Sequence, residues 1–388
     1  AVVIFFFLIY GFSISGIDMR YPFLIVAFIF MAFRFRGFAF PKTVINVVCF
    51  LGIMAIYSMA MALINGTGDY FEFMRFIRCT VTCILVAGFI WGYKVTPLQM
   101  IRILEIILIL NAFAIIATII FPELKVYLEV INQYEKTYSR WRAIGLLNGE
   151  DAAGFFCNIG LIIETVKRIY NRQGPVTWKT ILFVVATIFT SRMSMLFSAV
   201  ILLVCLFIIL RRKDYVHSFG IIVLLLPIAF FGGILWIITT NIAPGLREQI
   251  YRVFPILNTL YAQLTEGYLD YAAFSGIIQK HMSIEGLDFT QILMGAGYRS
   301  ALKKDIGYIK TLYSIGLVGI ISEISFYYFC CKKVVKSIDK YSNYLKVIFI
   351  IVTIIHLPWE YKNSFLFSSG FFEMYIALFF SISFHRGE

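Results

Sequence analysis

Charged residues are scarce in this sequence, and their scarcity excludes most classes of soluble protein. Only 14% of the 388 residues are Asp, Glu, Lys or Arg, whereas 60% are hydrophobic. About a quarter of the residues of a soluble domain are charged. The apolar residues form continuous runs instead of alternating with polar ones, which favours transmembrane helices over a β-barrel. The sequence therefore predicts an all-α, polytopic membrane helix bundle.

Motifs that would supply nucleotide or metal chemistry are also missing. The seven cysteines lie in or beside apolar runs, without metal-site or disulfide spacing, so we interpret them as small core residues. The sequence contains no glycine-rich nucleotide loop and no Ser/His/Asp or Cys/His arrangement. Asp69 and Glu72 stand three residues apart, which alone is a weak metal signal. We therefore predict no metal site and no cofactor, and we expect no cleavable signal peptide.

The apolar runs predict about twelve membrane-spanning helices within a single integral membrane domain, residues 1–388. They cover roughly 1–17, 21–33, 43–64, 74–93, 100–121, 152–170, 179–190, 194–210, 219–239, 306–331, 346–357 and 365–384. Two connections are long, 122–151 and 240–304, and the others are short. In the second, apolar residues from Leu246 to Leu264 recur at helical spacing, which predicts an amphipathic helix and hence a helical loop.

The net charge of +12 does not indicate a nucleic-acid partner, because the charge follows membrane topology. With the N-terminus inside, more than half of the 34 basic residues fall in connections on the cytoplasmic side, where acids are few. The opposite side is nearly neutral. This positive-inside bias predicts that both long connections face away from the cytoplasm.

Arginines on the outer side are the main candidates for binding chemistry. Arg75 and Arg78 are three residues apart and share a helix face, and Arg192 lies in the tight turn Thr190-Ser-Arg. The positive-inside rule does not explain them, and a guanidinium binds phosphate bidentately at any working pH. We interpret the set as an anion site, with snorkelling to lipid headgroups as the alternative. The set is Arg20, Arg75, Arg78, Arg140, Arg142, Arg192, Arg247, Arg252 and Arg299.

Asp305 stands where the second long connection re-enters the membrane. A carboxylate there is partly desolvated, which suits a general base, although it could equally cap the helix that follows. Two further acids, Glu323 and Glu373, fall deep inside predicted spans. An intramembrane carboxylate is a functional hypothesis by default, so these two keep a transporter open as an alternative class.

Three short motifs resemble the bacterial O-antigen polymerase (Wzy) family and, more distantly, the related O-antigen ligases. They are Arg140-Trp-Arg142-Ala-Ile-Gly145-Leu-Leu-Asn148, Thr190-Ser191-Arg192, and Gly295-Ala-Gly297-Tyr followed by Asp305-x-x-Tyr308-Ile and Gly316-x-x-Gly319. The ligases place a His where this chain has Asp305, which argues against a ligase. The likeness in topology covers most of the chain, whereas the motifs cover a small part of it.

The resemblance implies a metal-independent, GT-C-like glycosyltransferase of the bacterial inner membrane with a large helical periplasmic loop. Such an enzyme joins oligosaccharide repeat units carried on undecaprenyl pyrophosphate at the periplasmic face. Its substrates are lipid-linked glycans in membrane lipid, and a chain-length regulator and a flippase are the protein partners that the family suggests. The alternatives are an O-antigen ligase or another lipid-pyrophosphate-glycan transferase, and a flippase or transporter of lipid-linked oligosaccharides.

This chemistry needs a pyrophosphate clamp, a base for the acceptor hydroxyl and a groove for sugars. The predicted catalytic residues are Asp305, Arg192 and Arg142. Gly295 and Gly297 are expected to let the backbone approach the substrate closely. The predicted substrate-binding residues are Arg75, Arg78, Arg140, Arg247, Arg252 and Arg299, with Tyr298 and Tyr308 available to stack on sugar rings.

Overall fold

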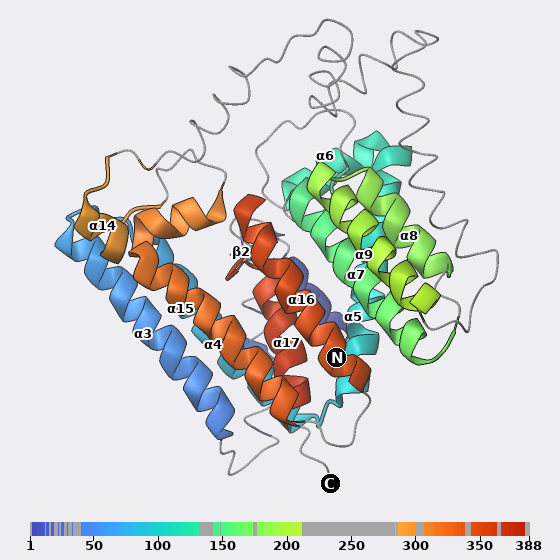
Figure 1. Ribbon diagram of the computed structural model, residues 1–388. Coiled ribbons are helices and arrows are strands. Elements are labelled where there is room, and N and C mark those ends of the chain that lie inside the picture. The colour runs from blue at the N-terminus through green and yellow to red at the C-terminus, as the bar shows by residue number, and fades with distance from the viewer. Residues whose placement is uncertain are drawn as a thin grey trace, which may run out of the picture. The chain divides into compact units, whose positions relative to one another are not determined.

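The computed structural model of the chain is helical nearly throughout its described part (Figure 1). It describes residues 2–11, 13–14, 17–18, 22, 25–26, 29, 33, 40–131, 143–147, 149–173, 177–211, 284, 286–299, 306–337, 343–362 and 366–384. The exception is a two-residue antiparallel ladder, in which β1 (Ser13–Ile14) pairs with β2 (Ile17–Asp18). The all-α prediction is confirmed for these residues.

The helices of the described part follow the apolar runs of the sequence closely. They are α1 (Val2–Tyr10), α3 (Lys42–Ile64), α4 (Phe71–Gly92), α5 (Pro97–Ile120), α6 (Pro122–Ile131), α7 (Glu150–Tyr170), α8 (Trp178–Ile188), α9 (Arg192–Arg211), α14 (Phe289–Met294), α15 (Gly307–Ser337), α16 (Asn343–Lys362) and α17 (Phe371–Phe384). Helices α6 and α14 lie in the two long connections. The amphipathic helix predicted from Leu246 to Leu264 lies outside the described residues.

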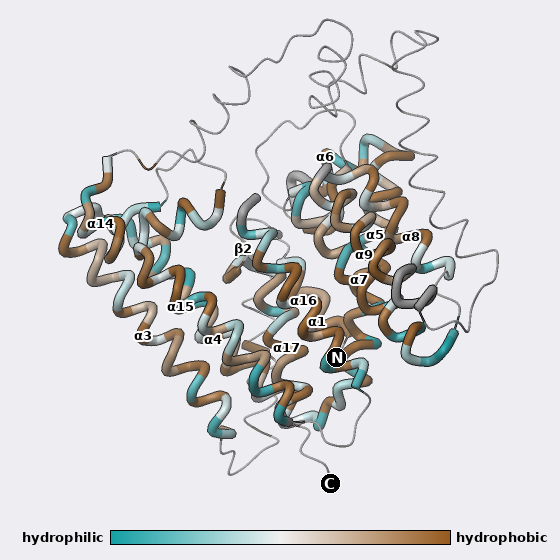
Figure 2. Tube along the Cα trace, in the orientation of Figure 1, coloured by the Kyte–Doolittle hydropathy of each residue, from teal (hydrophilic) through white to brown (hydrophobic). Residues whose placement is uncertain are grey.

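Five helices of the described part are long and apolar enough to cross a membrane. They are Lys42–Ile64, Phe71–Gly92, Pro97–Ile120, Gly307–Lys336 and Asn343–Glu360, and Figure 2 shows the hydrophobic residues along them. Shorter apolar helices cover Trp178–Ile188, Met193–Cys205 and Phe371–Phe384. The membrane character is thus supported, while about twelve spans and a GT-C-like arrangement remain predictions.

The first predicted span, residues 1–17, is wrong in its length. Helix α1 ends at Tyr10, because Gly11 adopts a positive φ of 57° and the chain then enters the β1–β2 ladder. The Gly11 N–H donates to the Phe7 carbonyl oxygen at 3.0 Å, which closes the last turn of α1.

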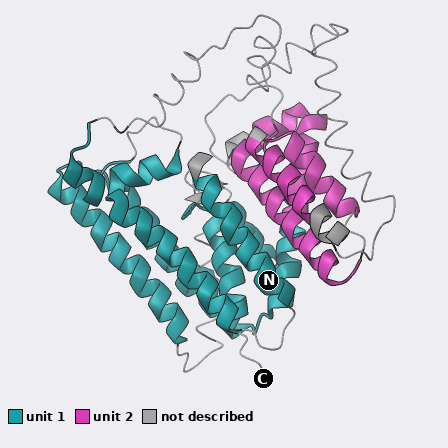
Figure 3. Ribbon diagram, in the orientation of Figure 1, with its two compact units in different colours: residues 1–107, 279–388 teal, residues 108–278 magenta. Residues whose placement is uncertain are grey.

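The chain divides into two compact units (Figure 3). Unit 1 contains Ala1–Ile107 and Gln279–Glu388, and unit 2 contains Leu108–Ile278, so helix α5 begins in one and ends in the other. In unit 1, α4 packs on α3 and α17, and α15 packs on α3, α14, α16 and α17. In unit 2, α7, α8 and α9 pack against one another.

Candidate functional site

The end of the second long connection is held firmly on unit 1. Asp288 caps α14 in a capping box with Gln291, whose N–H donates to Asp288 Oδ1 at 2.7 Å. The Tyr57 hydroxyl of α3 then donates to the Met294 carbonyl oxygen at 2.6 Å. Thr67 Oγ1 donates to the Gly297 carbonyl oxygen at 2.7 Å. Residues Met294 and Gly297 of segment 288–299 are therefore hydrogen-bonded to α3 and to the turn that follows it.

The same segment is also hydrogen-bonded to α15, next to a kink in that helix. Gly316 interrupts α15 with φ 65° and ψ −169°, which frees backbone carbonyls one turn earlier. The N–H of Ala296 donates to the Tyr313 carbonyl oxygen at 2.8 Å, and that of Gly297 to the Ser314 carbonyl oxygen at 3.1 Å. The motif glycines before Asp305 and the later Gly316 thus meet in one backbone junction.

Gly295 and Gly297 serve this junction, while their approach to substrate stays a prediction. Their φ values are 98° and 75°, in the left-handed region that disfavours other residues. A Cβ on Gly295 would stand 2.6 Å from Ile315 Cα, and a Cβ on Gly297 would stand 2.7 Å from Ala62 Cα. Both glycines are needed because protein backbone already fills the space beside them.

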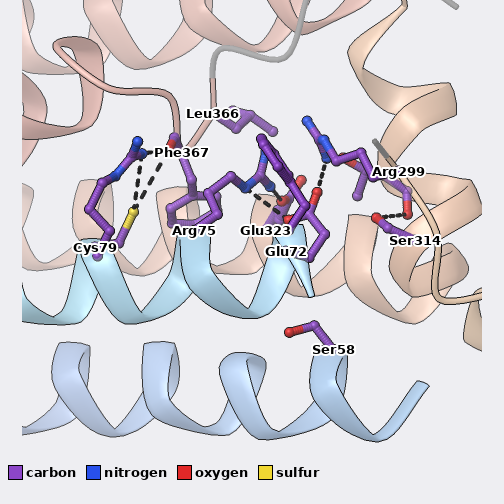
Figure 4. Close-up of polar contacts among 12 residues, drawn as sticks. Ser58, Glu72, Arg75, Cys79, Arg299, Ser314, Glu323, Leu366 and Phe367 are labelled. Carbon is purple, nitrogen blue, oxygen red and sulfur yellow. Dashed lines mark hydrogen bonds and ion pairs between the residues drawn. The ribbon is translucent and has the colours of Figure 1, made fainter. Parts of the chain in front are cut away.

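Arg299 ends this segment inside a group of buried charged side chains, here called the charge cluster, formed by Glu72, Arg75, Arg299, Glu323 and Glu360. Figure 4 shows the first four of these side chains together. Arg75 Nε lies 2.8 Å from Glu72 Oε2, and Arg75 Nη2 lies 2.7 Å from Glu323 Oε1. Arg299 Nη1 pairs with Glu72 Oε1. Glu72 therefore bridges two arginines, one from α4 and one from the long connection.

Burial makes the pairing within the charge cluster obligatory. Arg75 and Arg299 are only 7% and 6% exposed, and Glu323 and Glu360 are completely buried. An unpaired ion at such a position would cost several kcal/mol. Burial and the neighbouring Arg75 lower the pKa of Arg299, while Glu72 opposes this effect. An arginine guanidinium stays protonated in proteins at working pH, so Arg299 remains a cation.

Glu360 joins the charge cluster from the end of α16. Its Oε2 accepts a hydrogen bond from the Leu366 N–H at 2.8 Å. Gly307, the first residue of α15, lies directly against it, since a Cβ there would stand 2.6 Å from the Glu360 carbonyl oxygen. Asp305 itself lies outside the described residues. Gly307, two residues later in the chain, is fixed beside Glu360.

Arg78 holds the connection between α16 and α17 from the next turn of α4. Its Nη2 donates to the Phe367 carbonyl oxygen at 2.5 Å, and the Cys79 thiol approaches the same oxygen at 3.7 Å (Figure 4). The Tyr327 hydroxyl donates to the adjacent Leu366 carbonyl oxygen at 2.6 Å. Arg78 therefore differs from Arg75 in having a neutral carbonyl as its hydrogen-bond acceptor.

In unit 2, a backbone hydrogen bond joins two of the arginine-bearing motifs. The Ala143 N–H donates to the Phe189 carbonyl oxygen at 2.8 Å. Ala143 directly follows Arg142 in the chain, and Phe189 stands just before the turn that leads to Arg192, the first residue of α9. The segments that carry these two arginines are consequently neighbours.

A buried polar network supports the turn before Arg192. The Ser194 N–H donates to Ser191 Oγ at 3.2 Å, and Asn158 Nδ2 of α7 donates to the Ser194 carbonyl oxygen at 3.1 Å. The Ser198 hydroxyl donates to Asn158 Oδ1 at 2.5 Å and lies 2.9 Å from Thr187 Oγ1. Because hydrogen bonds of this kind fix helices where water is absent, the turn is rigidly placed on α7.

The structure brings some of the predicted site residues together and leaves others undescribed. Arg75, Arg78 and Arg299 converge in unit 1, where Tyr298 stacks edge-on against Tyr313 at 5.3 Å between ring centroids. The Tyr308 hydroxyl donates to the Leu357 carbonyl oxygen at 2.7 Å. The residues outside the described part are Arg140, Arg142, Arg247, Arg252 and Asp305, together with the side chain of Arg192. Substrate binding by any of these residues stays a prediction.

Two acids, Glu360 and Glu373, lie elsewhere in the helices than the predicted spans placed them. Glu360 falls outside the predicted span 346–357, yet α16 continues through Pro358 to Lys362 and includes it. Glu373 was expected deep in a span, but it lies in the first turn of α17, where its Oε2 accepts from the Gly370 N–H. Glu72 and Arg75, three residues apart, were the sequence signal for the charge cluster.

No protein-family model, curated protein sequence or solved structure matches the chain.

Proposed function

We propose that this protein is a membrane-embedded, metal-independent glycosyltransferase of the O-antigen polymerase type, with a GT-C-like arrangement of about twelve spans. In this proposal it joins repeat units carried on undecaprenyl pyrophosphate at the periplasmic face of the bacterial inner membrane. The growing glycan leaves its lipid pyrophosphate and is transferred to a new lipid-linked unit.

The observation that carries the proposal is the Ala143–Phe189 hydrogen bond at 2.8 Å. It makes neighbours of the segments that carry Arg142 and Arg192, which lie far apart in the sequence. Two guanidiniums close together suit a pyrophosphate leaving group, because bidentate contacts neutralise the developing negative charge without a metal ion. The network around Asn158 supports this role by fixing the turn before Arg192.

The junction in unit 1 supports the assignment of a base. Segment 288–299 is anchored on α3 and α15, and Gly307 is fixed beside Glu360. The few residues between these two anchors include Asp305. In the proposed reaction, the Asp305 carboxylate takes the proton of the acceptor hydroxyl as that oxygen attacks the anomeric carbon. The bond from this carbon to the pyrophosphate oxygen breaks, and the pyrophosphate leaves with the electron pair of that bond.

Two alternatives make different demands on the described residues. A ligase would use the same donor but another acceptor. The product of the reaction therefore distinguishes a ligase from a polymerase. A flippase would need polar groups exposed along a transport route near the membrane midplane. Glu323 and Glu373 were the candidates for this, but Glu323 pairs with Arg75 and Glu373 accepts from the Gly370 N–H within unit 1. Neither contact favours a transport role for these acids.

The proposal is tested by incubating the purified chain with lipid-linked repeat units and resolving the products on a gel. Arg142→Ala and Arg192→Ala are expected to abolish the polymer ladder, while Lys336→Ala, which removes an exposed charge at the other end of α15, leaves it unchanged. Asp305→Asn should lose turnover more than donor binding. Normal ladders from both arginine variants would refute the clamp. Transfer to a lipid A acceptor without polymer would identify a ligase instead.

A further inference from the structure

Unit 1 contains an open groove between α1, α4 and α5. Its volume is about 540 Å³, which falls in the range of about 300–1,000 Å³ that is usual for small-molecule sites. Most of its walls are apolar, for example Phe89, Val95 and Ile103. Its two most polar members, Gln99 and Arg102, both come from the start of α5. The groove is therefore amphiphilic, with its polar groups gathered on one helix.

The polar side of the groove is positively charged. Arg102 is exposed and makes no hydrogen bond or ion pair with any residue in the part of the chain that the structure describes. Gln99 completes a capping box with Thr96, whose N–H donates to Gln99 Oε1 at 3.0 Å, so the positive end of the α5 dipole lies here. Lys94, between α4 and α5, is exposed as well. The nearest acid along α5, Glu105, is 7% exposed.

The depth of Arg102 matches a lipid headgroup. The predicted topology places the start of α5 at the cytoplasmic surface, and Arg102 lies about 8 Å along the helix from Pro97 at about 1.5 Å per residue. The headgroup layer on each side of a bilayer is roughly 5–8 Å thick. A guanidinium at this depth reaches phosphate groups, while the apolar walls below it face acyl chains.

We propose that this groove binds one anionic phospholipid of the cytoplasmic leaflet. Its acyl chain lies along Phe89, Val95 and Ile103, and its phosphate accepts hydrogen bonds from Arg102. A net negative charge is what the site selects, because Arg102, Lys94 and the α5 dipole are all positive. The site depends on the membrane topology of unit 1 and is independent of the proposed transferase reaction.

Native mass spectrometry of the full chain tests the site by counting phospholipids retained from mixed micelles. The wild type is expected to retain one phosphatidylglycerol in preference to phosphatidylcholine at equal concentrations. Arg102→Ala should lower this retention about fivefold, the factor expected for one basic group near a membrane surface. Arg102→Lys should keep most of it. Ile106→Trp, which narrows the groove at a residue 45% exposed, should lower the retention of both lipids.

Lys42→Ala is the matched control, because Lys42 is an exposed basic residue at the predicted cytoplasmic end of α3 and does not line the groove. Equal retention of phosphatidylglycerol by wild type and Arg102→Ala, or an equal loss in Lys42→Ala, would overturn the proposal. So would displacement of phosphatidylglycerol by an equimolar polyprenyl phosphate, which would assign the groove to another lipid. If Arg102→Ala does not fold, Arg102→Lys and Ile106→Trp decide the question with the same measurement.

Discussion

Removing the negative charge of Glu72 should destabilise unit 1 strongly. Glu72 Oε2 lies 2.8 Å from Arg75 Nε, and Glu72 Oε1 pairs with Arg299, while the side chain is only 4% exposed. Glu72→Gln keeps the shape but leaves two buried guanidiniums with one carboxylate partner fewer. Breaking a buried ion pair in this way costs about 3–5 kcal/mol.

The loss can be followed as thermal unfolding of the detergent-solubilised protein. A unit of this size loses roughly 2–4 °C of melting temperature per kcal/mol, so Glu72→Gln should melt roughly 6–20 °C lower. Glu123→Gln is the matched control, because Glu123 is an exposed acid in the first turn of α6. Surface substitutions of this kind change stability by about 0.5 kcal/mol or less.

A double-mutant cycle separates the Glu72–Arg299 contact from general damage. If the two side chains interact directly, the combined Glu72→Gln and Arg299→Gln variant should lose less stability than the sum of the single variants, by about 1–3 kcal/mol. Additive losses would show that the pair is not coupled. A melting temperature of Glu72→Gln equal to that of Glu123→Gln would refute the reasoning altogether.

Two further predictions concern the junction in unit 1 and the network in unit 2. Gly297→Ala should destabilise by more than Gly286→Ala, although both residues have positive φ, 75° and 79°, because only Gly297 has backbone within 4 Å of the added Cβ. Equal melting temperatures would show that φ alone sets the cost. Ser198→Ala should cost about 1–3 kcal/mol by leaving Asn158 Oδ1 unsatisfied, whereas Ser322→Ala, which removes an exposed hydroxyl bonded within its own helix, should cost about 0.5 kcal/mol or less. Each variant is compared with its control by thermal unfolding. Equal losses of stability in Ser198→Ala and Ser322→Ala would contradict a structural role for the network around Asn158.

Hydropathy predicted the helices well because the bilayer imposes one dominant requirement on them. The run 43–64 became α3 at Lys42–Ile64, and 74–93 became α4 at Phe71–Gly92. The predicted helix ends are wrong where a single residue outweighs the average hydropathy of a run, as at Gly11, which ends α1. Pro358 is the opposite case, since α16 passes through a residue that usually ends a helix.

Partners distant in the sequence could not be predicted in the same way. The pairing of Arg75 with Glu72 follows from their spacing on one helix face. Its second partner, Glu323, is 248 positions away, and Arg299 is 227 positions from Glu72. No local pattern indicates such contacts, because they depend on how α4, α15 and the long connection pack. The same holds for the Ala143–Phe189 hydrogen bond.

These distant partners change what the arginines can do. Arg75 and Arg299 share Glu72, and Arg75 also pairs with Glu323, so a pyrophosphate at either guanidinium would compete with a buried carboxylate that already neutralises it. Leaving that carboxylate unpaired would cost several kcal/mol, which a phosphate contact would first have to offset. The arginines of the predicted anion site therefore fall into two groups, according to whether a buried acid already pairs with them. Those of the charge cluster stabilise the junction before Asp305, and the proposed clamp falls to Arg142 and Arg192 in unit 2.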